Sequence, residues 1–135
     1  MQALPAIELD HVGIAVEGTA GQPLLEVLGE NPALTEMRSG VAVGRFGPGR
    51  RLELVVPSRG GSPIERFLDR RGPGLHHVAL RVDEPLANVL ERLREQGIET
   101  AGSIEPSSDG RPSVFLHPST TGGVLVELVE GPRPA

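Results

Sequence analysis

The sequence of 135 residues has no cysteine, no tryptophan and no tyrosine, and its phenylalanines are Phe46, Phe67 and Phe115 alone. The absence of cysteine excludes disulfides and thiolate ligands, so any metal must be bound by His, Asp or Glu. Three phenylalanines are a poor platform for stacking bases, and a net charge of −5 provides no broad basic surface. The composition therefore predicts no nucleic-acid partner and favours a small-molecule ligand.

Long apolar runs are missing as well. No stretch approaches the roughly 20 apolar residues of a membrane helix, and MQALPAIELD at the start lacks the basic and apolar regions of a signal peptide. We therefore expect no membrane partner and a cytoplasmic location. A hydrophobic fraction of 38% and a charged fraction of 23% are those of an ordinary globular protein. A chain of this length fits one domain.

The chain contains an internal repeat. DHVGIAV at 10–16 matches HHVALRV at 76–82, and each is followed by a helix pattern with shared letters, PLLEVL at 23–28 and PLANVL at 85–90. Asp83 is the expected cap of the second helix. Each half then closes with two strands around a turn. These strands are expected at 41–46 and 51–57, and at 113–118 and 124–130.

A linker helix is predicted between the halves, at about 62–71. Ser62 and Glu65 have the spacing of a capping box, and Pro63 takes the first helical position. Because neither half alone could bury both faces of its sheet, we predict that residues 1–135 form a single α+β domain. Its two modules are expected at about 6–57 and 74–131.

Each half carries one histidine in its first strand and one glutamate in its last strand. Alternation along a strand places Glu127 on an otherwise apolar face, where burial of a carboxylate is costly unless it is paired. Two imidazoles and two carboxylates suit an octahedral divalent transition metal, with positions left for water or substrate. The pattern therefore predicts a metal site. Its ligands are His11, Glu53, His77 and Glu127.

The alternative interpretation treats these residues one at a time. A single strand glutamate is more often a solvated edge residue, and a single strand histidine is more often a hydrogen-bonded core residue. The repetition of both residue types at matching places favours the metal interpretation. Of the paired histidines, His77 aligns with His11, so His76 is expected to be a structural neighbour.

At these residues the sequence resembles the vicinal oxygen chelate superfamily, which includes glyoxalase I, extradiol dioxygenases and bleomycin-resistance proteins. Within it, the resemblance is greatest to the methylmalonyl-CoA epimerase branch. The stretches that carry it are DHVGIAV at 10–16, SPIERFLDRRGPGLHHVALRV at 62–82 and SVFLHPSTTGGVLVELVE at 113–130. The resemblance implies two βαβββ modules that form a curved mixed sheet around a metal site.

The resemblance also implies roles for the candidate residues. His11, His77 and Glu127 match the ligands of the family, and Glu53 lies where epimerases carry Gln or Glu. Glu127 is the implied catalytic base, and His117 is a candidate substrate contact, with a turn histidine as the alternative. Cobalt is the first metal implied, with manganese, nickel, zinc and iron as alternatives.

The implied activity is a metal-dependent epimerase that moves the C2 proton of methylmalonyl-CoA, or of a similar 2-substituted acyl-CoA, through an enolate. The implied partners are the acyl-CoA and a second copy of the chain in a homodimer. One departure concerns a glutamate that several epimerases carry as a second base, since the matching position here is about Val43.

Two other functions remain open. The ligand set also fits a glyoxalase I-type lyase or isomerase, and the absent glutamate favours a non-catalytic small-molecule binding protein of the same superfamily. Arginines near the first hairpin and on the linker provide a modest hint of coenzyme A phosphate binding, but a solvated, charge-balanced face is the expected role of most of them. They are Arg45, Arg50, Arg51, Arg59, Arg66, Arg70 and Arg71.

Overall fold

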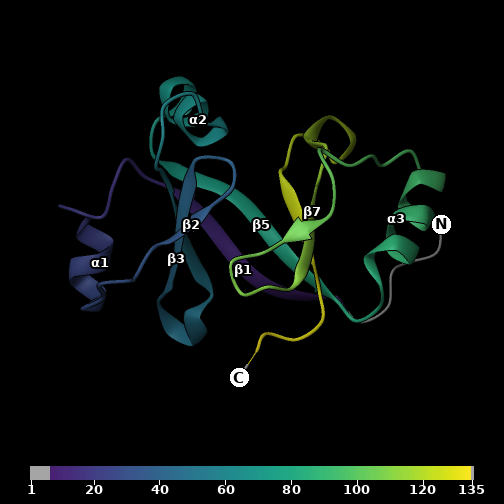
Figure 1. Ribbon diagram of the computed structural model, residues 1–135, viewed down its shortest axis with the longest axis horizontal. Helices are drawn as coiled ribbons and strands as arrows, with labels where there is room; N and C mark the ends of the chain where they lie inside the picture. The colour runs from purple at the N-terminus through teal and green to yellow at the C-terminus, as the bar shows by residue number, and fades with distance from the viewer. Residues whose placement is uncertain (1–6, 135) are drawn as a thin grey trace. The chain divides into compact units, whose positions relative to one another are not determined.

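The computed structural model describes residues 7–134, which divide into two compact units (Figure 1). The N-terminal unit is His11–His76, and the C-terminal unit consists of the described residues up to Asp10 together with those from His77 onward. Strands β1 (Glu8–Ala15) and β5 (Gly74–Val82) have residues in both units. Each unit has its own strand order and its own apolar core.

The N-terminal unit has a four-stranded mixed arrangement with the order β2-β3-β4-β1. Strand β4 runs parallel to β1 and antiparallel to β3, and β3 is antiparallel to β2. The linker helix follows β4. The elements are α1 (Pro23–Leu28), β2 (Thr35–Met37), β3 (Val41–Phe46), a 3-10 turn (Pro48–Arg50), β4 (Leu52–Pro57) and α2 (Pro63–Arg71).

The C-terminal unit repeats this arrangement with the order β5-β8-β7-β6. Strand β8 is parallel to β5 and antiparallel to β7, and β7 is antiparallel to β6. The same βαβββ order in both halves confirms the predicted fold. The elements are α3 (Leu86–Glu95), β6 (Glu105–Pro106), β7 (Pro112–Leu116), a 3-10 turn (Pro118–Thr120) and β8 (Val126–Glu130).

In the N-terminal unit, both faces of the strands are packed. Leu25 of α1 packs with Phe46 and Leu54 on one face. On the opposite face, Val43 and Val55 pack with α2 residues, including Leu68. The α2 face is also the face of Glu53, because Glu53 and Val55 are two residues apart on β4. Helix α2 therefore covers one end of this face.

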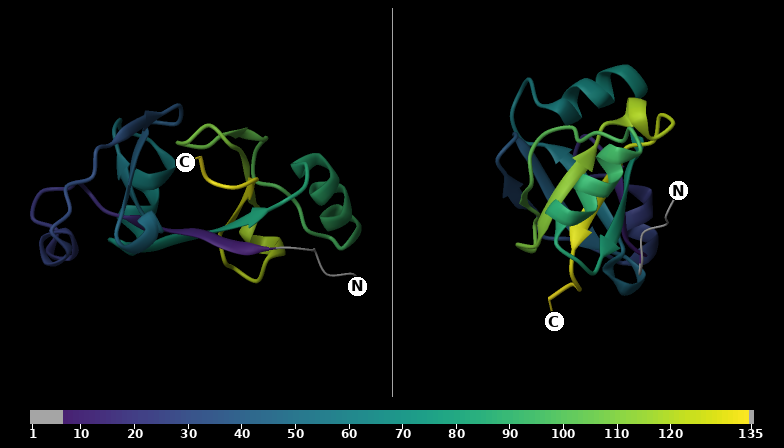
Figure 2. Two further views of the ribbon diagram at one scale, coloured as in Figure 1. Left: turned by 90° about the horizontal axis from the view of Figure 1, so that it is seen from below. Right: turned by 90° about the vertical axis from the view of Figure 1, so that its right-hand side faces the viewer.

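In the C-terminal unit, helix α3 packs against one face of the strands. Figures 1 and 2 show α3 to one side of β7, and its residues Leu86, Val89 and Leu90 form one cluster with Val114 and Leu128. Strand alternation then directs Glu127 toward the face away from α3. Helix α3 therefore forms the apolar core of this unit on one face of the strands, and Glu127 lies on the opposite face.

The helix caps show where local prediction succeeds and where it is wrong. The Ser62 hydroxyl accepts a hydrogen bond from the Glu65 backbone N–H at 3.1 Å, as the capping-box spacing predicts. Asp83, in contrast, does not cap α3, because its carboxylate pairs with Arg81 at 3.2 Å. Instead, the Leu86 N–H donates to Glu130 Oε1 at 2.8 Å, so the cap comes from β8.

None of the helices in residues 7–134 is long and apolar enough to cross a membrane.

Gly44 on β3 is a position that the Ala33 carbonyl and the side chains of its two neighbours approach closely. A Cβ atom added there would lie 2.8 Å from the Ala33 carbonyl oxygen and 3.0 Å from Leu34 Cδ2. We expect Gly44→Ala to lower the free energy of unfolding by about 1–3 kcal/mol, because the strand must shift to relieve the overlap. Urea unfolding measures this loss. Gly18→Ala is the control, since an added Cβ there meets nothing within 4 Å, and an equal loss in both variants would contradict the steric explanation.

Candidate metal centre

The N-terminal unit places His11 and Glu53 side by side on adjacent parallel strands. His11 Nε2 lies 3.5 Å from Glu53 Oε1, and both residues are buried. Gly13 is opposite Glu53 in the register of β1 and β4, and because Gly13 has no side chain, the imidazole two residues earlier on β1 can approach the carboxylate. The two predicted ligands of this module therefore form one His–Glu pair.

The C-terminal unit contains the matching pair. His77 Nε2 lies 3.5 Å from Glu127 Oε1, and both residues are buried. Ala79 is opposite Glu127 in the register of β5 and β8, as Gly13 is opposite Glu53. The duplicated fold thus builds the same kind of pair twice, with the same imidazole nitrogen facing the carboxylate and a small residue, Gly13 or Ala79, opposite each glutamate.

The geometry of each pair fits two ligands of a divalent cation. A separation of 3.5 Å is longer than a good hydrogen bond. Two donors that are each about 2.1 Å from one cation are separated by about 3.0 Å at a right angle and about 3.4 Å at the tetrahedral angle. Imidazole nitrogen and carboxylate oxygen are also the donors that divalent transition metals take. The residues present therefore fit the metal that the sequence pattern predicts.

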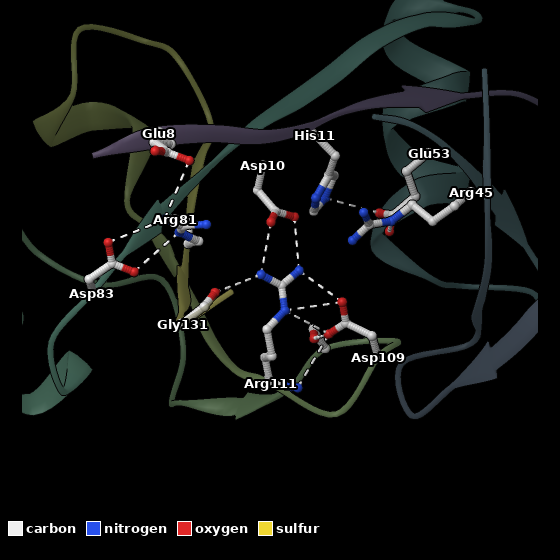
Figure 3. A network of polar contacts seen from close by, with 11 residues as sticks. Glu8, Asp10, His11, Arg45, Glu53, Arg81, Asp83, Asp109, Arg111 and Gly131 are labelled. Atoms are coloured by element: carbon white, nitrogen blue, oxygen red, sulfur yellow. Dashed lines mark hydrogen bonds and ion pairs between the residues drawn. The ribbon is translucent and has the colours of Figure 1, made fainter. Parts of the chain in front are cut away.

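Arg45 is a neighbour of Glu53 that the sequence analysis placed among the candidate phosphate-binding arginines. Arg45 is opposite Glu53 in the register of β3 and β4, and its Nε donates to Glu53 Oε2 at 2.8 Å (Figure 3). Its side chain is 11% exposed, so it lies against the carboxylate and away from solvent. From the alternation along β3, the sequence could have predicted that Arg45 shares a face with Val43. It could not have predicted the pairing with Glu53, because that pairing depends on the register of the hairpin.

Phe115 occupies the corresponding place beside Glu127. It is opposite Glu127 in the register of β7 and β8, and its ring contacts the His77 imidazole edge-to-face, with 5.3 Å between the centroids. Edge-to-face packing restrains the orientation of an aromatic ring. The second histidine is therefore held by an aromatic neighbour.

Val43 lies where the sequence comparison with epimerases expects a glutamate. It is buried, it is opposite Val55 in the register of β3 and β4, and it packs in the α2 cluster. A hydrocarbon side chain cannot exchange a proton, so this position supplies no base.

The two remaining candidate histidines have structural neighbours. His76 contacts the Phe67 ring edge-to-face, with 5.0 Å between the centroids, in line with the expected structural role. His117 is exposed at the turn after β7, where its Nδ1 accepts a hydrogen bond from the Ser119 backbone N–H at 3.2 Å. A contact between His117 and substrate stays a prediction.

A buried ion-pair network in the C-terminal unit was not predicted from the sequence. Arg111 Nη1 and Nη2 donate to the two Asp10 oxygens at 2.8 and 3.0 Å, and Nη2 also donates to Asp109 Oδ2 at 2.8 Å (Figure 3). Asp10 and Arg111 are 101 residues apart in the chain, so no local pattern indicates their contact. Asp10 immediately precedes His11.

The network shifts the ionisation of its members. Burial by itself would raise the pKa of Asp109, but the hydrogen bonds from Arg111 and Ser107 outweigh it and lower the pKa below its usual value. Burial would likewise lower the pKa of Arg111, but Asp10 and Asp109 outweigh it and raise the pKa. Asp109 and Arg111 are therefore both charged over the physiological pH range.

The sequence matches the family model described as the Glyoxalase/Bleomycin resistance protein/Dioxygenase superfamily over residues 10–115. The chain belongs to this superfamily, which confirms the predicted membership. The ethylmalonyl-CoA/methylmalonyl-CoA epimerase of Cereibacter sphaeroides is 42% identical over 84 residues, which cover 60% of this chain and 62% of that protein. The match thus spans less than two thirds of that relative.

Two solved structures of epimerases are similar over nearly the whole chain. Methylmalonyl-CoA epimerase from Mycobacterium tuberculosis is 35% identical, with a TM-score of 0.79, and covers 92% of this chain and 87% of its own. A methylmalonyl-CoA epimerase solved in complex with methylmalonyl-CoA and NH4+ is 28% identical, with a TM-score of 0.75, and covers 91% of this chain and 93% of its own. The resemblance inferred from the sequence is confirmed.

Proposed function

We propose that the protein is a metal-dependent epimerase that acts at C2 of methylmalonyl-CoA or of a similar 2-substituted acyl-CoA. The observation that carries the proposal is the duplicated buried His–Glu pair, with 3.5 Å between Nε2 and Oε1 in each unit. The similarity to epimerases, one of them solved with methylmalonyl-CoA, indicates the substrate class.

In this proposal His11, Glu53, His77 and Glu127 hold one divalent cation, with cobalt as the first metal to test. When bound, such a cation acts as a Lewis acid that stabilises negative charge on the thioester oxygen of the substrate. The charge balance supports a divalent ion, because two carboxylates and two neutral imidazoles match its two positive charges. The support for this ligand set is the repeated pair and the superfamily membership.

Glu127 has the role of general base. Its carboxylate takes the C2 proton, the C–H bond breaks, and the electron pair moves into the thioester carbonyl to give the enolate. Return of a proton to the opposite face of C2 completes the epimerisation. Because the Val43 side chain has no ionisable group, this proton is returned by a group other than the side chain at that position. A buried carboxylate is suited to the first step, since it is not screened by bulk water.

Four further features belong to the proposal: the first and third rest on the family resemblance, and the second and fourth rest on the sequence pattern. His117 contacts the substrate from the turn after β7, the two modules act as a single domain, the chain forms a homodimer, and it works in the cytoplasm. Light scattering of the purified protein on a sizing column tests the dimer.

Proton NMR of methylmalonyl-CoA in deuterated buffer tests the activity. Protein stripped of metal and then reloaded with cobalt is expected to exchange the C2 proton for deuterium well above the background rate, and the stripped protein is not. A protein that binds cobalt tightly without any exchange would contradict the epimerase proposal. Thiol adducts of 2-oxoaldehydes would then test the glyoxalase alternative, and failure with both substrates would favour a binding role.

A further inference from the structure

We propose that Arg45 is a positioning residue that allows Glu53 to bind the metal through one oxygen only. The inference rests on the proposed metal function. It also gives a role to a difference between the two halves of the duplicated fold. The residue opposite Glu53 is Arg45, and the residue opposite Glu127 is Phe115.

The two oxygens of the Glu53 carboxylate have different neighbours. Oε1 faces His11 Nε2 at 3.5 Å, and Oε2 accepts a hydrogen bond from Arg45 Nε at 2.8 Å. A carboxylate can bind a cation with one oxygen or with both. A charge-assisted hydrogen bond of this length occupies Oε2, so Oε1 is the oxygen that can ligate beside the imidazole.

The backbone holds this arrangement in place. Arg45 and Glu53 are directly opposite each other on antiparallel strands β3 and β4, and their side chains are 11% and 8% exposed. Separating the two members of a buried ion pair is strongly destabilising, because it leaves a charge buried without its partner. Arg45 therefore stays against Glu53 and does not reach out toward a solvent-exposed phosphate.

The guanidinium also changes the charge of the proposed site. Two carboxylates neutralise a divalent cation, and Arg45 adds one positive charge in contact with Glu53. A substrate that carries a free carboxylate and develops further negative charge at its thioester oxygen is favoured by this surplus. Phe115 beside Glu127 contributes no such charge, so the duplicated fold surrounds its two glutamates differently.

Cobalt titration of the full-length protein, followed by its visible absorption spectrum, tests the role. We expect Arg45→Met to weaken cobalt binding by about 10–100-fold, as loss of a residue that orients a ligand does. We also expect altered absorption bands, because Glu53 can then bind through both oxygens. Arg45→Lys should restore part of the affinity. Arg92→Met, which removes the same charge from a surface pair with Glu84 in the C-terminal unit, should leave affinity and spectrum unchanged.

A second variant separates positioning from folding. In a Glu53→Gln background the neutral amide interacts much more weakly with the guanidinium, so adding Arg45→Met should change cobalt affinity less than it does in the wild-type background, by about twofold at most. An equal loss in both backgrounds would overturn the inference, because Arg45 would then not act through Glu53. An unchanged spectrum and affinity in Arg45→Met, with one cobalt bound per wild-type chain, would overturn the role of Arg45 alone. A wild-type protein that binds no cobalt would overturn both this inference and the proposed function.

Discussion

Glu127→Gln is expected to lower the rate of C2 proton exchange by about 10²–10⁴-fold at saturating cobalt, the usual contribution of a general base. The amide keeps an oxygen that can ligate a metal, but it cannot accept the substrate proton. Cobalt should therefore still bind, although less tightly, while exchange is lost. The measurement is deuterium incorporation at C2 by NMR, made together with the cobalt content of the same sample.

Glu53→Gln is the matched control for this prediction. The two glutamates have the same 3.5 Å geometry toward their histidines, so a purely geometric role would affect both variants equally. We expect Glu53→Gln to lose less than about tenfold in exchange, because the amide oxygen can replace a ligand but not a base. Equal losses in the two variants would contradict the assignment of Glu127 as the base. A larger loss at Glu53 would reverse the assignment.

Arg111→Met is expected to lower the free energy of unfolding by about 3–5 kcal/mol, because it leaves Asp10 and Asp109 without their shared cation. Asp10 is 2% exposed, and its two oxygens accept from Arg111 at 2.8 and 3.0 Å. Urea unfolding at pH 7 measures the loss. Because methionine preserves much of the side-chain volume, the loss of stability reports mainly the removal of the positive charge.

Two comparisons test the origin of this loss. Arg92→Met breaks the bidentate pair with Glu84 on the surface, at 2.8 and 2.7 Å, and should cost much less because water screens that pair. The difference in free energy of unfolding between the wild type and Arg111→Met should also shrink below about pH 4. The pKa of Asp109 is lowered in the folded state, so the stabilisation from its carboxylate is fully present above the unfolded-state pKa. It is lost as the pH falls through the folded-state pKa. Similar losses for both arginines, or an advantage that grows in acid, would contradict the buried-network explanation.

The elements that the sequence predicted well are those with local signals. Helix α2 begins at Pro63 after a Ser62 cap, and the two His strands are recognisable because the chain repeats them. Strands β2 and β6 were missed, since three and two residues are too short to show alternation. Strand β8 begins at Val126, two residues later than predicted, because the Thr121 hydroxyl bonds the Val124 carbonyl and extends the preceding turn.

The candidate site was predictable to the extent that it is duplicated. His11 with Glu53, and His77 with Glu127, could be matched by position in the repeat, and the structure places each pair together. Arg45 could not be assigned in this way, because its pairing depends on the register of a hairpin closed by a 3-10 turn. The Asp10–Arg111 contact was beyond any local pattern, since only the folded topology connects residues so distant in the chain.

Asp10 and His11 are consecutive residues of one strand, which has a consequence for the fidelity of folding. Consecutive residues of a regular strand point to opposite faces, so a slip of the strand by one residue would exchange the places of two such side chains. Because a carboxylate is itself a common metal ligand, such a slipped strand could still attract a cation and persist as a misassembled form. Arg111 disfavours such a slip, because its guanidinium donates to both Asp10 oxygens in the observed register, at 2.8 and 3.0 Å, and an imidazole in that place would not accept both hydrogen bonds. The Asp10–Arg111 ion pair thus favours the observed register of the strand that carries the first histidine.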